Sequence, residues 1–227
     1  MRAILKKELK SYFLSPIGYV VIGIFLLFFS IFFYLTVFTQ GTVDLGALYY
    51  YTALYGLIII APILTMRMFA EERKNGTEQL ILTAPISITR VVIAKFIAAT
   101  LVIIVTELCT FMYFAILSFF GNPHIITALV SMLGFTLLAM SYISFGLFTS
   151  SLTEHQMLGG VISTSFFILL WILPAINNVF TQFSLIDVFS KFPTGQIDIA
   201  DTITLITFTV CSLILTIIIM QRRKCAR

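Results

Sequence analysis

Side chains that could catalyse a reaction or hold a metal are sparse in this sequence. The motif GxxxxGK[ST], with which many ATPases cradle phosphates, is absent, and so are HExxH and GxSxG. Three cysteines, Cys109, Cys211 and Cys225, are scattered without CxxC spacing, so the sequence indicates neither a zinc site nor a disulfide framework. We therefore expect a chain that is not an enzyme and that itself binds no metal and no cofactor.

The densest group of charged side chains lies between residues 67 and 90, in the stretch RMFAEERKNGTEQLILTAPISITR. Its first part predicts a short helix that stops at Gly76, where a left-handed backbone costs little. A second short helix with an apolar surface should begin at Thr77 and end at Pro85. The pattern favours a docking surface for a partner protein, and the alternative is a solvated charged loop. The candidate docking residues are Glu71, Glu72, Arg73, Gly76, Thr77, Glu78, Leu80, Leu82 and Pro85.

Glu107 is the one acidic residue deep inside a long apolar run. Counted from just past Lys95 at 1.5 Å per residue, it lies about 16 Å into a hydrocarbon layer of about 30 Å. A charge at that depth costs on the order of 3 kcal/mol, so the carboxyl must face protein or water, or carry a proton. Two interpretations stay open: a residue that lines a translocation path, and a structural carboxyl bonded to neighbours such as Thr106 or Thr110.

The elements that must position these residues are membrane-spanning helices. Of the 227 residues, 59% are apolar and only 11% are charged, whereas about one quarter of a soluble domain is charged. This composition excludes a water-soluble globule, and the 23 phenylalanines exclude a disordered chain. The net charge of +4 arises at membrane-flanking positions, without the basic stripe that nucleic-acid binding needs. We expect an all-α polytopic membrane protein with a single transmembrane domain over residues 1–227.

Six apolar runs are each long enough to cross the hydrocarbon layer. They cover residues 17–38, 47–66, 91–120, 125–148, 157–176 and 203–220. Lysines and arginines, which are enriched on cytoplasmic flanks, gather before the first span, between the second and third spans, and after the sixth. Both chain ends and the segment 67–90 are therefore expected to face the cytoplasm.

Residues 1–15 predict an amphipathic helix on the inner membrane surface. Their sequence, MRAILKKELKSYFLS, is expected to put Leu5, Leu9, Tyr12 and Phe13 on one helical face and Lys6, Lys7 and Lys10 elsewhere. The alternative is a basic flank that only sets the topology.

Small residues recur at helical spacing on the fifth span. They are Gly159, Gly160, Ser163 and Thr164. Such residues let two helices approach closely, either within one chain or between two chains. The sequence does not choose between these interpretations.

Several segments closely resemble the permease subunits of type-2 ABC exporters, especially the gliding-motility-associated and nitrous-oxide-reductase-maturation kind. They are SPIGYVVIGIF, LTMRMFAEERKNGTEQLILTAPISITRVVIAKF, SSLTEHQM and FSLIDVFSKFPTGQIDIADTITLITF. The resemblance covers nearly the whole chain. It is most specific at Arg67, Glu71-Glu72-Arg73, Gly76-Thr77, Leu80 and Thr83-x-Pro85.

This resemblance implies a six-span permease in a prokaryotic inner membrane. It would pair with a second permease, as a homodimer or heterodimer, and with two separate P-loop ATPase subunits that bind ATP and Mg²⁺. Closure of these subunits would move the spans through a coupling helix at Gly76 to Thr83. The resemblance also implies a connecting helix at residues 1–15 and a re-entrant outer hairpin at 179–198. From other classes, a secondary transporter or channel, and a membrane anchor for a cytosolic complex, remain alternatives.

Overall fold

The computed structural model describes residues 2–14, 16–39, 41, 44–79, 87–121, 124–176, 181 and 184–225. Within these ranges every regular element is a helix, which confirms the all-α prediction. Six helices are long and apolar enough to cross a membrane, as predicted. They are Gly18–Phe38, Leu45–Lys74, Ile88–Phe119, Ile125–Leu152, Gln156–Ile176 and Ile199–Lys224.

The first two spans are built from several helical pieces. The chain begins with α1 (Arg2–Leu14) and continues into α2 (Pro16–Phe33), which ends in a π-helical turn over Tyr34–Thr39. The second span consists of α3 (Leu45–Tyr51), a π-helical segment (Thr52–Leu57) and α4 (Ile58–Thr65). A short helix, α5 (Ala70–Lys74), follows after a turn.

The remaining spans are continuous helices. They are α7 (Ile88–Phe120), α8 (Ile125–Leu152), α9 (Gln156–Ile176) and α11 (Ile199–Cys225). Between α9 and α11 lie α10 (Leu185–Phe189) and a 3-10 turn (Phe192–Thr194), within the segment predicted to form a re-entrant hairpin. Residues 179–180 and 182–183 of that segment lie outside the described residues, so the hairpin stays a prediction.

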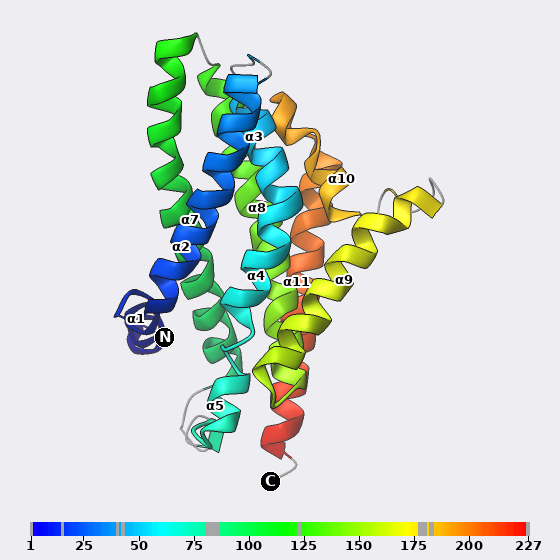
Figure 1. Ribbon diagram of the computed structural model, residues 1–227. Helices are drawn as coiled ribbons and strands as arrows, with labels where there is room; N and C mark the ends of the chain where they lie inside the picture. Colours follow the sequence, from blue (N-terminus) through cyan, green and yellow to red (C-terminus); the bar gives the residue numbers. More distant parts are fainter. Residues whose placement is uncertain are drawn as a thin grey trace.

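The bundle is organised around α8, which packs against α3, α4, α7, α9 and α11 (Figure 1). Glycines allow this close packing, because a Cβ added at Gly134 would clash with Phe192 and one at Gly146 with Thr65. Short polar residues on α8 bond to carbonyls of their own helix one turn back, as Ser144 does to Ser141. The central span therefore buries polar side chains without leaving their hydroxyls unpaired.

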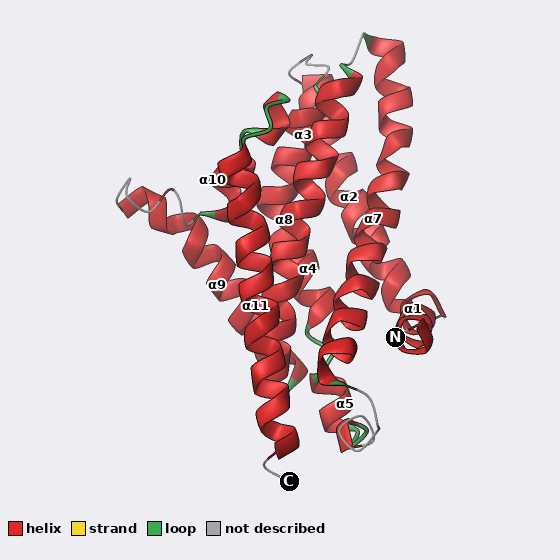
Figure 2. Cartoon of the chain, turned by 180° about the vertical axis from the view of Figure 1, so that it is seen from behind, coloured by secondary structure: helices red, strands yellow, loops and turns green. Residues whose placement is uncertain are grey.

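One end of the bundle carries α1, α5 and the carboxyl end of α11. Both overall views look almost along the axis of α1, while the spans run vertically, so α1 lies crosswise to the spans (Figure 2). It packs against α7 and α2. This arrangement brings residues from the start of the chain beside the charged segment that follows α4.

Candidate functional site at the α5 end of the bundle

The start of α5 is held by a serine of α8. Ser150 Oγ accepts the backbone N–H groups of Phe69 at 3.1 Å and Ala70 at 3.3 Å, and it donates to the Met66 carbonyl at 3.2 Å. The first N–H groups of a helix have no partner inside that helix. Ser150 supplies one from a neighbouring span, so α8 determines where the charged segment leaves the membrane end of α4.

The end of α5 is a left-handed turn at Gly76. The backbone φ angle of this residue is +70°, and its N–H donates to the Arg73 carbonyl at 3.1 Å. Thr77 Oγ1 donates to the Glu72 carbonyl at 3.1 Å, which closes the turn, and Glu78 begins a further helical stretch. Three candidate docking residues, Leu80, Leu82 and Pro85, lie outside the described residues.

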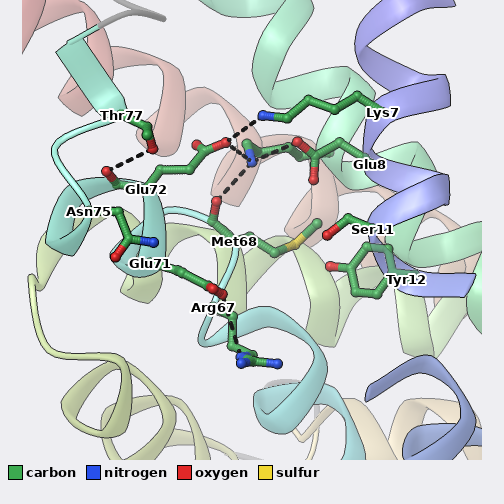
Figure 3. Close-up of a pocket in the computed structure, with 11 residues that line it drawn as sticks. Lys7, Glu8, Ser11, Tyr12, Arg67, Met68, Glu71, Glu72, Asn75 and Thr77 are labelled. Atoms are coloured by element: carbon green, nitrogen blue, oxygen red, sulfur yellow. Dashed lines mark hydrogen bonds and ion pairs between the residues drawn. The ribbon is translucent and has the colours of Figure 1, made fainter. Parts of the chain in front are cut away.

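Three charged side chains from distant parts of the chain meet beside α5, and we call them the buried ion cluster: Glu8, Glu72 and Lys95. Lys95 Nζ lies 3.0 Å from Glu8 Oε1 and 2.9 Å from Glu72 Oε1, and it donates to the Met68 carbonyl at 2.8 Å. The Lys95 side chain is only 2% exposed. Figure 3 shows Glu8, Glu72 and Met68 converging from α1 and from the segment around α5.

The lysine of this cluster is fully paired, whereas Glu72 Oε2 is buried without a hydrogen-bond partner among the described residues. An ammonium group has three N–H donors, and Lys95 has three acceptors within hydrogen-bond distance. Lys7 adds a second, exposed contact to Glu72 at 3.5 Å. Because a buried charge that loses its partner costs several kcal/mol, the cluster links α1, α5 and α7 to one another.

A polar cavity of about 200 Å³ opens beside the cluster. Its lining comprises Lys7, Glu8, Ser11, Tyr12, Arg67, Met68, Glu71, Glu72, Asn75, Thr77 and Lys95. The charges of the three basic and three acidic side chains in this lining cancel. The volume of the cavity is below the roughly 300 Å³ at which small-molecule sites begin. The cavity is therefore poorly suited to a nucleotide.

Tyr12 forms the wall of this cavity nearest the bundle. Its hydroxyl donates to the Leu64 carbonyl at 3.4 Å, which ties α1 to the end of α4. Burial raises the pKa of Tyr12 well above its ordinary value, and the nearby Glu8 carboxylate raises it further. The hydroxyl therefore stays protonated and keeps donating throughout the physiological range.

A second set of charges, the peripheral ion network, joins the other side of α5 to the carboxyl end of α11. Arg73 lies 2.5 Å from Glu154 and 3.8 Å from Glu78, and Arg223 lies 3.4 Å from Glu78. Arg223 also donates to the Leu152 carbonyl at 3.4 Å. Exposed ion pairs each contribute little, but this set connects α5, the α8–α9 connection and α11.

Glu107 is enclosed between α7 and α8, with 1% of its surface exposed. Its Oε2 accepts the Thr136 hydroxyl at 2.7 Å, and Oε1 has no hydrogen-bond partner among the described residues. The neighbours expected from the sequence bond elsewhere: Thr110 donates to the Glu107 backbone carbonyl and Thr106 to that of Val102. The hydrogen-bond partner of the Glu107 carboxyl is on another helix, so residues close to Glu107 in the sequence do not reveal it. Whether the carboxyl lines a path stays a prediction.

The small residues of α9 pack within the chain. A Cβ added at Gly160 would lie 3.4 Å from Met66 Sδ, and one at Gly159 would lie 3.1 Å from Thr153 Oγ1. Ser163 is buried and Thr164 is half-buried. The exposed face of α9 carries Val161 and Leu169 instead. A role for the small residues in pairing with a second chain stays a prediction.

Sequence reasoning missed Glu8, Lys95 and Ser150. The sequence did contain one signal, because Lys95 stands inside the apolar run VVIAKFIAAT, where a lysine needs an acidic partner or a route to water. Charge counting at the ends of spans explains such a lysine only as a topology signal. Its partners are 87 and 23 residues away in sequence, and the tertiary structure identifies them.

A family model described as "ABC-2 family transporter protein" matches residues 2–216. The matched range includes α1, α5 and nearly all of the six spans. No curated protein matches the chain.

Proposed function

Because the chain belongs to the ABC-2 family of transporter proteins, we propose that it is the permease subunit of an ATP-driven exporter, related to the gliding-motility and nitrous-oxide-reductase-maturation permeases. In this proposal two P-loop ATPase subunits bind ATP and Mg²⁺ and dock at α5. A second permease, identical or related, completes the transporter. The complex lies in a prokaryotic plasma membrane with both termini of this chain in the cytoplasm.

The observation that carries the proposal is the set of connections around α5. Ser150 holds its start to α8, the buried ion cluster holds its middle to α1 and α7, and the peripheral ion network holds its end to α11. A force applied by a partner at α5 would therefore reach several spans without a flexible joint between them. A loop that only connected two spans would need none of these contacts.

The same proposal gives Glu107 a place in the transport cycle. Glu107 and Lys95 are both on α7 and are twelve residues, or about 18 Å, apart along the helix axis. A movement of α7 relative to α8 would separate Glu107 from Thr136 and expose its carboxyl. We propose that this exposure places Glu107 in the translocation path.

The first experiment tests the partnership. We expect an adjacent reading frame to encode a P-loop ATPase. The chain is expressed with that ATPase, and the complex is purified and reconstituted in proteoliposomes. We expect equal amounts of the two subunits and ATP hydrolysis that requires both. Hydrolysis by this chain alone, or transport driven by an ion gradient without an ATPase, would contradict the proposal and support an enzyme or a secondary transporter.

The second experiment tests the docking role of the α5 segment with two matched glycines. Gly76 and Gly41 have φ angles of +70° and +66°, no atom lies within 4 Å of a Cβ added at either, and both donate their N–H to a carbonyl of a preceding helical turn. Proline cannot adopt this conformation or donate this bond, so Gly76→Pro and Gly41→Pro cause the same local damage at opposite ends of the bundle.

We expect both variants to insert in the membrane and only Gly76→Pro to lose ATPase binding and ATP-driven transport. Co-purified ATPase and transport rate are measured at equal permease levels. If Gly41→Pro lowered both to the same extent, the effect would be general destabilisation and the docking role of this segment would be wrong.

A further inference from the structure

The helix α1 has two faces with different surroundings. Lys7, Glu8, Ser11 and Tyr12 face the polar cavity beside the buried ion cluster. A separate shallow hollow of about 340 Å³, almost wholly apolar, lies along the helix. It is lined by Leu5, Lys6, Leu9, Lys10, Phe13 and Leu14. At about 100° per residue, the centres of these two faces fall on nearly opposite sides of α1, so the hollow points away from α5.

The lysines of α1 divide between the two faces. Lys7 pairs with Glu72 on the face toward α5. Lys6 and Lys10 are exposed, lie one turn apart among the residues that line the apolar hollow, and form no ion pair with any described residue. Two positive charges without an ion pair therefore lie beside an apolar surface of which Leu5, Leu9 and Phe13 are half-buried.

The position of α1 indicates what could cover this surface. The helix lies crosswise to the spans, beside the lower part of the bundle, and it precedes the first span in the sequence (Figure 1). A bilayer crossed by the six spans would therefore bring its headgroups close to α1. Leu14, at the end of the hollow nearest the first span, is 76% exposed. An apolar face that also carries two lysines, at this depth, matches a lipid with a negative headgroup.

We propose that this hollow is a binding site for one anionic phospholipid. Its phosphate lies between Lys6 and Lys10, and an acyl chain follows Leu9 and Phe13 toward the bilayer. The site is specific because the positive pair repels the ammonium group of a zwitterionic headgroup and attracts a net negative one. Near an anionic surface each lysine contributes about fivefold to binding, so the pair should contribute roughly 25-fold. This proposal does not depend on the transport function.

The experiment compares two double variants with the same loss of charge. Lys6→Gln with Lys10→Gln removes the proposed headgroup site. Lys7→Gln with Lys74→Gln removes one lysine from the opposite face of α1 and one exposed lysine from α5. The full chain is purified in a neutral detergent and titrated with dioleoyl phosphatidylglycerol or dioleoyl phosphatidylcholine. Native mass spectrometry counts bound lipids and copies of the chain.

We expect a first phosphatidylglycerol to bind the wild type and the Lys7/Lys74 variant with the same affinity, and the Lys6/Lys10 variant at least tenfold more weakly. Equal weakening in the two variants would overturn the proposal, because only net charge would matter. Displacement of the lipid by millimolar glycerol phosphate would also overturn it, since a free phosphate would suffice. Loss of a dimer in the Lys6/Lys10 variant, with lipid binding unchanged, would assign the hollow to a second copy of the chain instead.

Discussion

Replacing Lys95 by methionine is the sharpest perturbation of this structure. The substitution keeps an unbranched side chain, one heavy atom shorter, and removes its charge, so Glu8 and Glu72 lose the ammonium that lies 3.0 and 2.9 Å from them. Their side chains are only 10% and 14% exposed, which leaves water little access to them. We expect the variant to be strongly destabilised at the junction of α1, α5 and α7.

The magnitude follows from two opposing terms. At an effective dielectric constant of about 20, two unit charges about 3 Å apart attract by about 5 kcal/mol. Desolvation of each buried ion cancels much of this gain, and removal of one partner from a buried pair costs about 3 to 5 kcal/mol. Lys95 has two such partners, so the loss should lie at the upper end, about 5 kcal/mol.

Lys191 provides a matched control. It also contacts two carboxylates, at 2.9 Å from Asp198 and 2.8 Å from Asp201, but 48% of its side chain is exposed. Solvent screens such a pair, so Lys191→Met should hardly change the unfolding transition. The triple variant Lys95→Met, Glu8→Gln, Glu72→Gln removes all three charges and should recover most of the lost stability.

The assay is equilibrium unfolding of the purified chain in detergent, with an independent probe of α1 such as proteolysis near Leu14. Lys95→Met should unfold at lower denaturant concentration and release α1 early. The reasoning would be refuted if Lys95→Met and Lys191→Met shifted the transition equally, or if the triple variant were no more stable than Lys95→Met.

Three further predictions concern single contacts. Ser150→Ala leaves the Phe69 and Ala70 N–H groups without their cap, and it should lower the free energy of unfolding by about 1 to 2 kcal/mol. Its buried neighbour Ser151 bonds only within α8 and should tolerate alanine. Equal losses of stability in the two variants would contradict the capping role of Ser150. Glu107→Gln should keep the bond with Thr136 and the unfolding midpoint but lower the transport rate, and normal transport would make the carboxyl structural. Hydrogen bonds to Asp201 and Asp198 raise the pKa of Lys191 from 10.5 to about 12. The small stabilisation that these solvent-screened pairs contribute is therefore complete below pH 10.5 and is lost as pH rises through 12. Asp201→Asn should lower the pKa of Lys191, so a membrane-impermeant ester added outside cells at pH 9 should acylate Lys191 faster. An unchanged rate of acylation would contradict the pairing of Lys191 with Asp201. Absence of any acylation would place this loop in the cytoplasm.

The sequence by itself determined the class of fold, and it predicted the helix end in the segment that we propose as the docking region. Six apolar runs predicted six spanning helices, because hydrocarbon offers no partners for backbone N–H and C=O groups and a helix satisfies them within the segment. Gly76 similarly predicted a helix end in the segment after α4, since left-handed backbone is a local preference of glycine. Such properties depend on residues close together in the chain.

Only the tertiary structure decided which charges meet. The KK pair at residues 6 and 7 looks uniform in sequence, yet Lys7 faces Glu72 and Lys6 faces the apolar hollow. Glu107 bonds to Thr136 on another helix, and Lys95 bonds to Glu8, 87 residues away. The strength of an ion pair depends on distance and on exposure to water. Both quantities are set by how the helices pack, which no local pattern of residue types contains.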